Sequence, residues 1–270
     1  MQTKFVKQIT QALSLYQYND IPILKLQHTL GEAEISLQGA QLLRWCPKSA
    51  QQNILWLSEI EPFAAGKAIR GGIPICYPWF GPIKEPMHGY ARIRLWQLSD
   101  YQIDEQKVRL DFSLFSSDNL IEAKLTIIFT EQCELRLTHY GNEPAQAALH
   151  TYFNIGDIVP VQIEGLPTQC FNKLTEQQEK VPSPRTISEN VDCIYQIQPP
   201  VTQKIVDPTF NRTIQIEQLE ASNTVLWNPW HKPTSNMSEN GYQTMVCVES
   251  AKLDQTMQQG DTIIVKISLN

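Results

Sequence analysis

Long apolar runs are absent from this 270-residue sequence. No segment approaches the roughly 20 consecutive apolar residues that a membrane-spanning helix needs. Residues 1–20 also lack the apolar centre and the small-residue cleavage site of a secretion signal. We therefore expect a cytoplasmic protein with no membrane partner.

Runs of basic residues are absent as well. The formal net charge is -6 and the isoelectric point is near 5.4, which argues against nucleic acid as a partner but leaves room for a local cationic pocket. The six cysteines include no CxxC pair, so we expect neither a zinc ribbon nor a redox pair. In a domain of this size most cysteines should be reduced and buried.

Several catalytic motifs are missing too. The sequence has no GxSxG for an acyl nucleophile, no GxxxxGK[ST] for nucleotide phosphates, no GxGxxG after a strand and no HExxH for zinc. We expect no metal and no cofactor. The chemistry must come from histidine, carboxylate and arginine side chains, a combination that suits proton transfer on a small anionic ligand.

The sequence does contain apolar alternation with a period of two, which is typical of half-buried strands. Turn residues punctuate it, and only residues 4–16 suggest a helix. This pattern predicts an all-β protein, a large antiparallel β-sandwich with few short helices, in which 1–270 form a single, monomeric domain. The expected strands are 33–37, 108–114, 263–269, 21–28, 40–46, 54–57, 94–103, 121–129, 133–141, 145–153, 159–164, 203–207, 213–218, 223–228 and 243–251.

The segment 70–94, RGGIPICYPWFGPIKEPMHGYARIR, has neither strand nor helix period. Gly71 and Gly72 permit close backbone approach, and Pro74, Pro78 and Pro82 stiffen the chain after them. Arg70 and Arg92 offer planar donor forks that suit phosphate or carboxylate. The segment therefore predicts a preformed binding loop. The alternative is a proline-rich loop on the end of the sandwich, with its arginines paired to local acids.

Glu249 is unusual because it lies in VCVES, inside an otherwise apolar strand. Burial raises the pKa of a carboxyl toward the range useful for a general base, so Glu249 is a catalytic candidate; the alternative is a structural ion pair. His150 lies at the end of another apolar strand. We interpret His28, His139 and His231 as structural, and Asp192 as either a ligand contact or a turn residue.

Five motifs in order, RGGIPICYPWFGP, HGYAR, ALHTYFNIGD, WNPW and VCVESA, resemble those of the hexose-6-phosphate mutarotases, also called glucose-6-phosphate 1-epimerases, of the galactose-mutarotase-like superfamily. The resemblance runs from about residue 33 onward. It implies a β-sandwich that interconverts the anomers of a hexose 6-phosphate without a cofactor. It also implies roles for six residues: a catalytic pair, His150 and Glu249; phosphate ligands, Arg70 and Arg92; a hydroxyl ligand, Asp192; and a residue near the ring, His88.

The chain departs from this family at Met87, where some relatives carry a glutamine that contacts the ligand. The departure bears on substrate choice and leaves the catalytic pair intact. Two alternative functions stay open: a catalytically inert sugar-phosphate-binding or regulatory module, and a mutarotase for unphosphorylated aldoses in which the arginines are structural.

Overall fold

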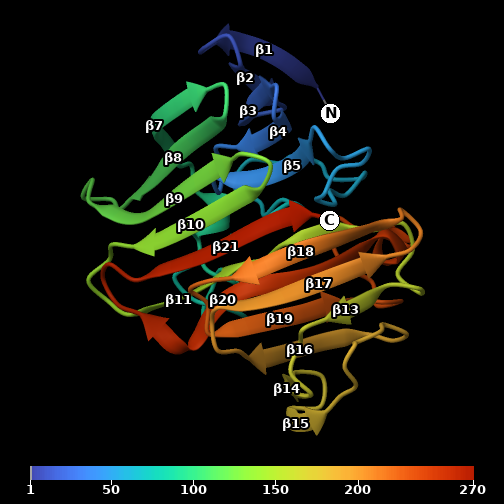
Figure 1. Ribbon diagram of the computed structural model, residues 1–270. Coiled ribbons are helices and arrows are strands. Elements are labelled where there is room, and N and C mark those ends of the chain that lie inside the picture. Colours follow the sequence, from blue (N-terminus) through green and yellow to red (C-terminus); the bar gives the residue numbers. More distant parts are fainter. Residues whose placement is uncertain (1) are drawn as a thin grey trace.

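The structure is a computed structural model that describes residues 2–270. Within this range the chain is nearly all strand, arranged in three antiparallel sheets with two short 3-10 helices (Figure 1). The prediction of a large antiparallel β-sandwich is confirmed. The helices are η1 (Ala91–Ile93) and η2 (Gly241–Thr244). No helix in the described part of the chain has the length and apolarity to cross a bilayer.

The smallest sheet has five strands in sequence order and lies at the upper end of the molecule in Figure 1. Its strands are β1 (Thr3–Gln8), β2 (Leu13–Tyr18), β3 (Ile21–His28), β4 (Gly31–Ser36) and β5 (Gln41–Pro47). The helix expected over 4–16 was wrong, because these residues form β1 and β2. All of β1 is exposed, so it shows no apolar alternation from which a strand could be read.

One eight-stranded sheet has most of the strands that alternation predicted. In spatial order these are β13 (Gln162–Glu164), β17 (Val201–Asp207), β18 (Arg212–Gln218), β21 (Thr262–Leu269), β10 (Cys133–His139), β9 (Ile121–Phe129), β8 (Lys107–Phe115) and β7 (Gln97–Asp104). In β21, Ile263, Val265 and Ile267 are buried while the residues between them are half-buried. Only residues 162–164 of the strand expected over 159–164 form β13.

The other eight-stranded sheet carries the site. Its spatial order is β15 (Gln177–Lys180), β14 (Gln169–Asn172), β16 (Val191–Gln196), β19 (Asn223–Asn228), β20 (Met245–Met257), β11 (Ala145–Leu149) and β6 (Ile75–Cys76), with β12 (Tyr152–Asn154) paired to β20. The strand expected over 145–153 is interrupted at His150, and residues 54–57 make only isolated bridges. Asp192 lies inside β16 rather than in a turn.

Strand β20 is buried on both of its faces over residues 245–251. Val246 and Val248 belong to the main core, which also contains Val265 of the facing sheet and Trp45 of the small sheet. Cys247 and Glu249 alternate with them and lie on the opposite face. The site is therefore built on the outer face of this sheet, where other chain segments cover it.

Candidate active site

Sheet register places His150 opposite Glu249. Leu149 of β11 pairs with Ser250 of β20, so the next residue on each strand continues the same antiparallel row. The His150 Nδ1 atom lies 3.4 Å from the Glu249 Oε1 atom. Both side chains are buried, with relative exposures of 8% and 1%.

Burial affects the two groups in opposite directions because it disfavours whichever form is charged. It raises the pKa of Glu249 well above the usual carboxyl range, and nearby Asp192 adds to the effect. It lowers the pKa of His150 well below the usual imidazole range, and His88, Arg70 and Arg92 lower it further. Without a ligand, the pair therefore favours a protonated carboxyl facing a neutral imidazole.

The loop between β6 and β7 covers this pair. The Gly81 amide donates to His88 Nδ1 at 3.2 Å, and the His88 ring lies 5.9 Å from the His150 ring. Burial and the surrounding cations lower the pKa of His88 to about 3. Gly89 has φ +75°, and a Cβ there would lie 2.0 Å from the Tyr77 carbonyl oxygen. Only glycine fits this contact, which fixes the path of the chain next to His88.

Arg70 lies on the other side of His150. Its Nη1 donates to the Tyr152 hydroxyl at 2.8 Å, while Nε and Nη2 donate to the carbonyl and hydroxyl oxygens of Ser235. The buried Glu61 carboxylate accepts the Arg70 backbone amide at 2.7 Å. Three guanidinium donors are thus held by the protein, so the position of Arg70 is fixed before any ligand arrives.

Arg92 belongs to helix η1 and is held less completely. Its Nη2 donates to the Met87 carbonyl oxygen. Its buried Nε has no hydrogen-bond partner among the described residues. A buried donor without a partner is uncommon and marks a place where a ligand oxygen would be stabilised.

Asp192 of β16 faces the same side of the sheet as Glu249. Asp192 pairs in register with Trp227, which pairs with Cys247. Lys173, at the end of β14, lies 3.1 Å from the Asp192 carboxylate. The Lys173 ammonium also lies 5.5 Å from the centre of the Phe80 ring. Lys173 is a third cation of the site, and the sequence analysis missed it.

Aromatic rings form one wall of the site. The His150 imidazole stacks on Tyr152 with 4.8 Å between ring centroids and an angle of 5°. Tyr152 stacks in turn on Trp56, and Trp227 contacts both His150 and Tyr152 edge-on. This stacking holds the imidazole plane. The WNPW motif supplies Trp227 and the ALHTYFNIGD motif supplies Tyr152, but Trp56 lies in none of the five motifs.

The six predicted site residues thus share one environment. His150, Glu249 and Asp192 lie on the outer face of one sheet, Arg92 and His88 belong to the covering loop, and Arg70 precedes β6. His139, interpreted as structural, is buried elsewhere and is bonded to Tyr77. A separate cleft of about 660 Å³ lies beyond Trp79 and Tyr90, and none of the six lines it. We place the chemistry at the His150 pair, where buried ionisable groups converge.

Comparisons with known proteins show the family of the chain. The family model described as aldose 1-epimerase matches residues 22–270. A protein of Haemophilus influenzae named "Putative glucose-6-phosphate 1-epimerase" is 56% identical over 271 residues, which are 100% of this chain and 99% of that protein.

Two solved structures are similar along nearly their whole length. The crystal structure of HI1317 has a TM-score of 0.99 and 59% identity, and the match covers 100% of both chains. The structure of "a putative mutarotase" from Salmonella typhimurium has a TM-score of 0.92 and 32% identity, covering 98% of this chain and 96% of that one. The similarity therefore extends to every element that carries the site.

Proposed function

Because the chain belongs to the aldose 1-epimerase family, and is therefore an isomerase, we propose that it interconverts the α and β anomers of a hexose 6-phosphate. One observation carries the proposal: the buried His150 and Glu249 side chains face each other at 3.4 Å among three cationic side chains. The name of the Haemophilus influenzae relative, which specifies glucose 6-phosphate, supports the same substrate class.

The reaction needs one base and one acid on either side of the anomeric centre. The Glu249 carboxylate takes the proton of the C1 hydroxyl. The C1–O5 bond breaks, its electron pair goes to O5, and His150 donates a proton there. Rotation about the C1–C2 bond turns the aldehyde, and closure with the two proton transfers reversed gives the other anomer.

The number of protons that the His150–Glu249 pair holds suits this order of reaction steps. A protonated carboxyl facing a neutral imidazole holds as many protons as a carboxylate facing an imidazolium, so one transfer across 3.4 Å converts the resting form into the reactive form. Burial lowers the pKa of His150 most, and the charges of His88, Arg70 and Arg92 lower it further. A bound phosphate dianion offsets those charges and favours the imidazolium. Phosphate binding thus favours the protonated form of His150, which is the acid of the reaction.

Arg92 and Arg70 bind the phosphate. The partnerless Nε of Arg92 supplies a donor that the folded chain does not use. Arg70 keeps one N–H on each terminal nitrogen after its bonds to Tyr152 and Ser235. Binding at this remote group holds C1 between acid and base, so it contributes to the rate as well as to affinity.

Asp192 accepts sugar hydroxyls, and His88 lies against the ring. With its depressed pKa, His88 stays neutral, and because its Nδ1 accepts from the Gly81 amide, its Nε2 presents one donor to the ligand. Lys173 holds the Asp192 carboxylate in place. The side chain of Met87 is 46% exposed and only its carbonyl contacts Arg92, so Met87 acts on substrate choice through the position of that arginine.

The test is anomer exchange of glucose 6-phosphate, measured by NMR magnetisation transfer for the wild type, Glu249→Gln and His150→Asn. We expect the wild type to accelerate exchange and each variant to lose at least about 100-fold, the range for a general acid or base. Glu249→Gln keeps the size of the side chain and His150→Asn makes it smaller, so circular dichroism shows whether the fold survives. Full activity in either folded variant contradicts the assignment.

Substrate comparison separates the alternatives. Exchange of glucose as fast as that of glucose 6-phosphate would make the protein a mutarotase for unphosphorylated aldoses. Phosphate-dependent binding of glucose 6-phosphate without acceleration would make it an inert sugar-phosphate-binding module. The cationic side chains argue against the first alternative, and the buried His150–Glu249 pair argues against the second.

A further inference from the structure

A third potential ligand lies beside the catalytic pair and has no part in the reaction. The Cys247 thiol, one His150 ring nitrogen and one Glu249 carboxylate oxygen lie within 4.8 Å of one another, and all three residues are buried. Cys247 and Glu249 are two residues apart on β20 and so share a face. Sheet register adds His150 opposite Glu249.

Two atoms of this cluster lack hydrogen bonds within the described part of the chain. They are His150 Nδ1 and Glu249 Oε2, in residues whose relative exposures are 8% and 1%. At 3.4 Å the contact between the two side chains is longer than a normal N–H···O hydrogen bond, so His150 Nδ1 is left without a partner in the resting form. Buried polar atoms without partners are rare in native structures, and each calls for a physical explanation. Here both belong to groups that ligate metals.

We propose that His150, Cys247 and Glu249 form an inhibitory site for Zn²⁺. Nitrogen, thiolate sulfur and carboxylate oxygen are the ligands that zinc prefers, and three protein ligands with a fourth open position are usual where zinc stays accessible to small molecules. Zinc–ligand bonds of about 2.0–2.3 Å place tetrahedral ligands about 3.3–3.8 Å apart. The three side chains need to close by only about 1 Å from their present separation.

Charge balance favours zinc despite the cations nearby. When the metal binds, the thiol and the carboxyl each release a proton to solvent as the Zn–S and Zn–O bonds form. The dication with one thiolate, one carboxylate and a neutral imidazole has no net charge. Arg70, Arg92 and Lys173 therefore face a neutral complex instead of a bare dication. Mg²⁺ and Ca²⁺ prefer oxygen ligands and should not bind.

Zinc at this position occupies both groups of the acid–base pair. The inhibition rests on the proposed function, whereas binding of the metal does not. We expect Zn²⁺ to inhibit anomer exchange competitively with glucose 6-phosphate, because substrate and metal need the same two side chains. Mg²⁺ at the same concentration should leave the rate unchanged.

The experiment compares the wild type with Cys247→Ser, Cys247→Ala and a control, Cys76→Ser, which alters another buried cysteine outside the cluster. Each protein is titrated with Co²⁺ as a coloured substitute for Zn²⁺, and the thiolate-to-cobalt absorption band is recorded. We expect the band in the wild type and Cys76→Ser, and its loss in both Cys247 variants. Zinc inhibition should weaken at least about tenfold in the Cys247 variants, with basal exchange unchanged.

The cobalt absorption band does not depend on catalysis, so the metal site and the epimerase activity are tested independently. No activity with a normal cobalt band rejects the epimerase assignment and keeps the metal site. Wild type without the band, or equal zinc inhibition in wild type and Cys247→Ala, rejects the metal site. If both Cys247 variants misfold, the wild-type band and the rise in melting temperature with Zn²⁺ still decide the question.

Discussion

Arg92 and Arg70 differ in how far the protein already uses each guanidinium. Arg70 donates three hydrogen bonds to protein atoms, whereas Arg92 donates one and has a partnerless Nε. We infer that Arg70 contributes mainly a fixed charge and a fixed position. Arg92 contributes the donors that a phosphate can take without breaking a bond already present.

We therefore expect Arg92→Met to raise the KM for glucose 6-phosphate about 10- to 100-fold, since a hydrogen bond to a charged group contributes about 1.5–3 kcal/mol. Residual exchange of glucose should change little, because glucose has no phosphate. Steady-state exchange rates with both sugars check this. Arg92→Lys keeps the charge and should recover part of the loss. If Arg92→Met impairs the exchange of glucose and of glucose 6-phosphate equally, Arg92 does not bind the phosphate.

Substitution of Gly89 tests whether its close contact with the Tyr77 carbonyl fixes the path of the loop. Gly89 and Gly81 share φ +75°, but a Cβ at Gly89 meets the Tyr77 carbonyl at 2.0 Å while one at Gly81 meets open space. We expect Gly81→Ala to cost about 1–2 kcal/mol of unfolding free energy, and Gly89→Ala to cost more and to slow exchange as well. Urea denaturation and exchange rates measure both. Equal losses would mean that the Tyr77 contact is unimportant.

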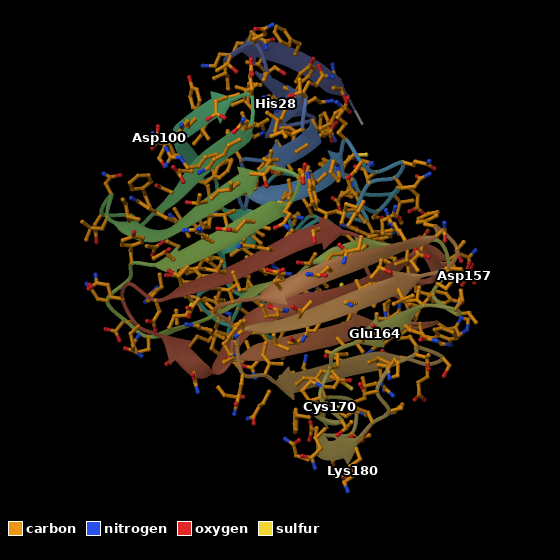
Figure 2. The ribbon with its side chains drawn as sticks, in the orientation of Figure 1. His28, Asp100, Asp157, Glu164, Cys170 and Lys180 are labelled. Atoms are coloured by element: carbon orange, nitrogen blue, oxygen red, sulfur yellow. The ribbon has the colours of Figure 1, made fainter. Side chains whose placement is uncertain are left out.

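The β14–β15 hairpin contributes Lys173 to the candidate site, and no pattern in the sequence predicted this contribution. It forms one edge of the site-bearing sheet, and Lys180, at its outer end, lies at the extremity of the molecule opposite the N-terminal sheet (Figures 1 and 2). Lys173, in the turn that joins β14 to β15, reaches Asp192. Because that contact is made across strands, nothing in the local sequence of residues 173–176 indicates it.

Lys173→Met keeps most of the side-chain volume and removes the charge. Lys173 and Asp192 are 30% and 20% exposed as side chains, so the loss of stability should stay within about 1 kcal/mol. The KM for glucose 6-phosphate should rise because Asp192 loses its partner. Lys180→Met on the same hairpin is the control and should leave KM unchanged. If both variants behave alike, Lys173 has no role at the site.

Element by element, the sequence predicted best where one face of a strand meets the core. Strands β8 and β21 follow from alternation because each has one buried and one half-buried face. The hairpin of β1 and β2 could not be recognised, since β1 buries nothing. Strand β16 was missed because it begins next to a polar interval. Asp192 was therefore expected near a turn, whereas in β16 its side chain lies on the face of the sheet that carries Glu249.

At the scale of the whole molecule, buried histidines link stability to pH. His139 is 2% exposed, with Nδ1 2.7 Å from the Tyr77 hydroxyl and Nε2 2.9 Å from the Glu143 carbonyl oxygen. Burial lowers its pKa below the usual value of 6.5. As pH falls, the unfolded chain takes up this proton first, so stability present above about pH 6.5 is lost progressively toward the folded-state pKa.

His139→Gln should reduce this pH dependence, because glutamine has no proton to gain. We expect the unfolding free energy of the wild type to fall more between pH 7 and pH 5 than that of the variant. Urea denaturation at several pH values measures the difference. Other buried ionisable groups are common to both proteins and cancel. Parallel curves would show that His139 keeps the same pKa on unfolding.

The site as a whole was predictable only in part. Glu249 was recognisable because a carboxylate within an apolar strand is costly, and the histidines and arginines were recognisable because they fall in motifs. The sequence could not provide the register that sets His150 opposite Glu249. It also could not show Cys247 as a neighbour of that pair, because a cysteine in an apolar strand looks like ordinary core.

The two faces of β20 have a consequence for mutational tolerance. A saturation scan of residues 245–251 that scores only total activity in cell extracts should give a block of sensitive positions, with small residues tolerated at Cys247, since both faces are buried. If protein abundance and catalytic turnover are scored separately, the cause of the loss should alternate from one residue to the next along the strand. Polar substitutions at Val246 and Val248 should deplete the protein, and substitution of Glu249 should leave a normal quantity of inert protein. Selection therefore acts on adjacent residues of one strand for different reasons.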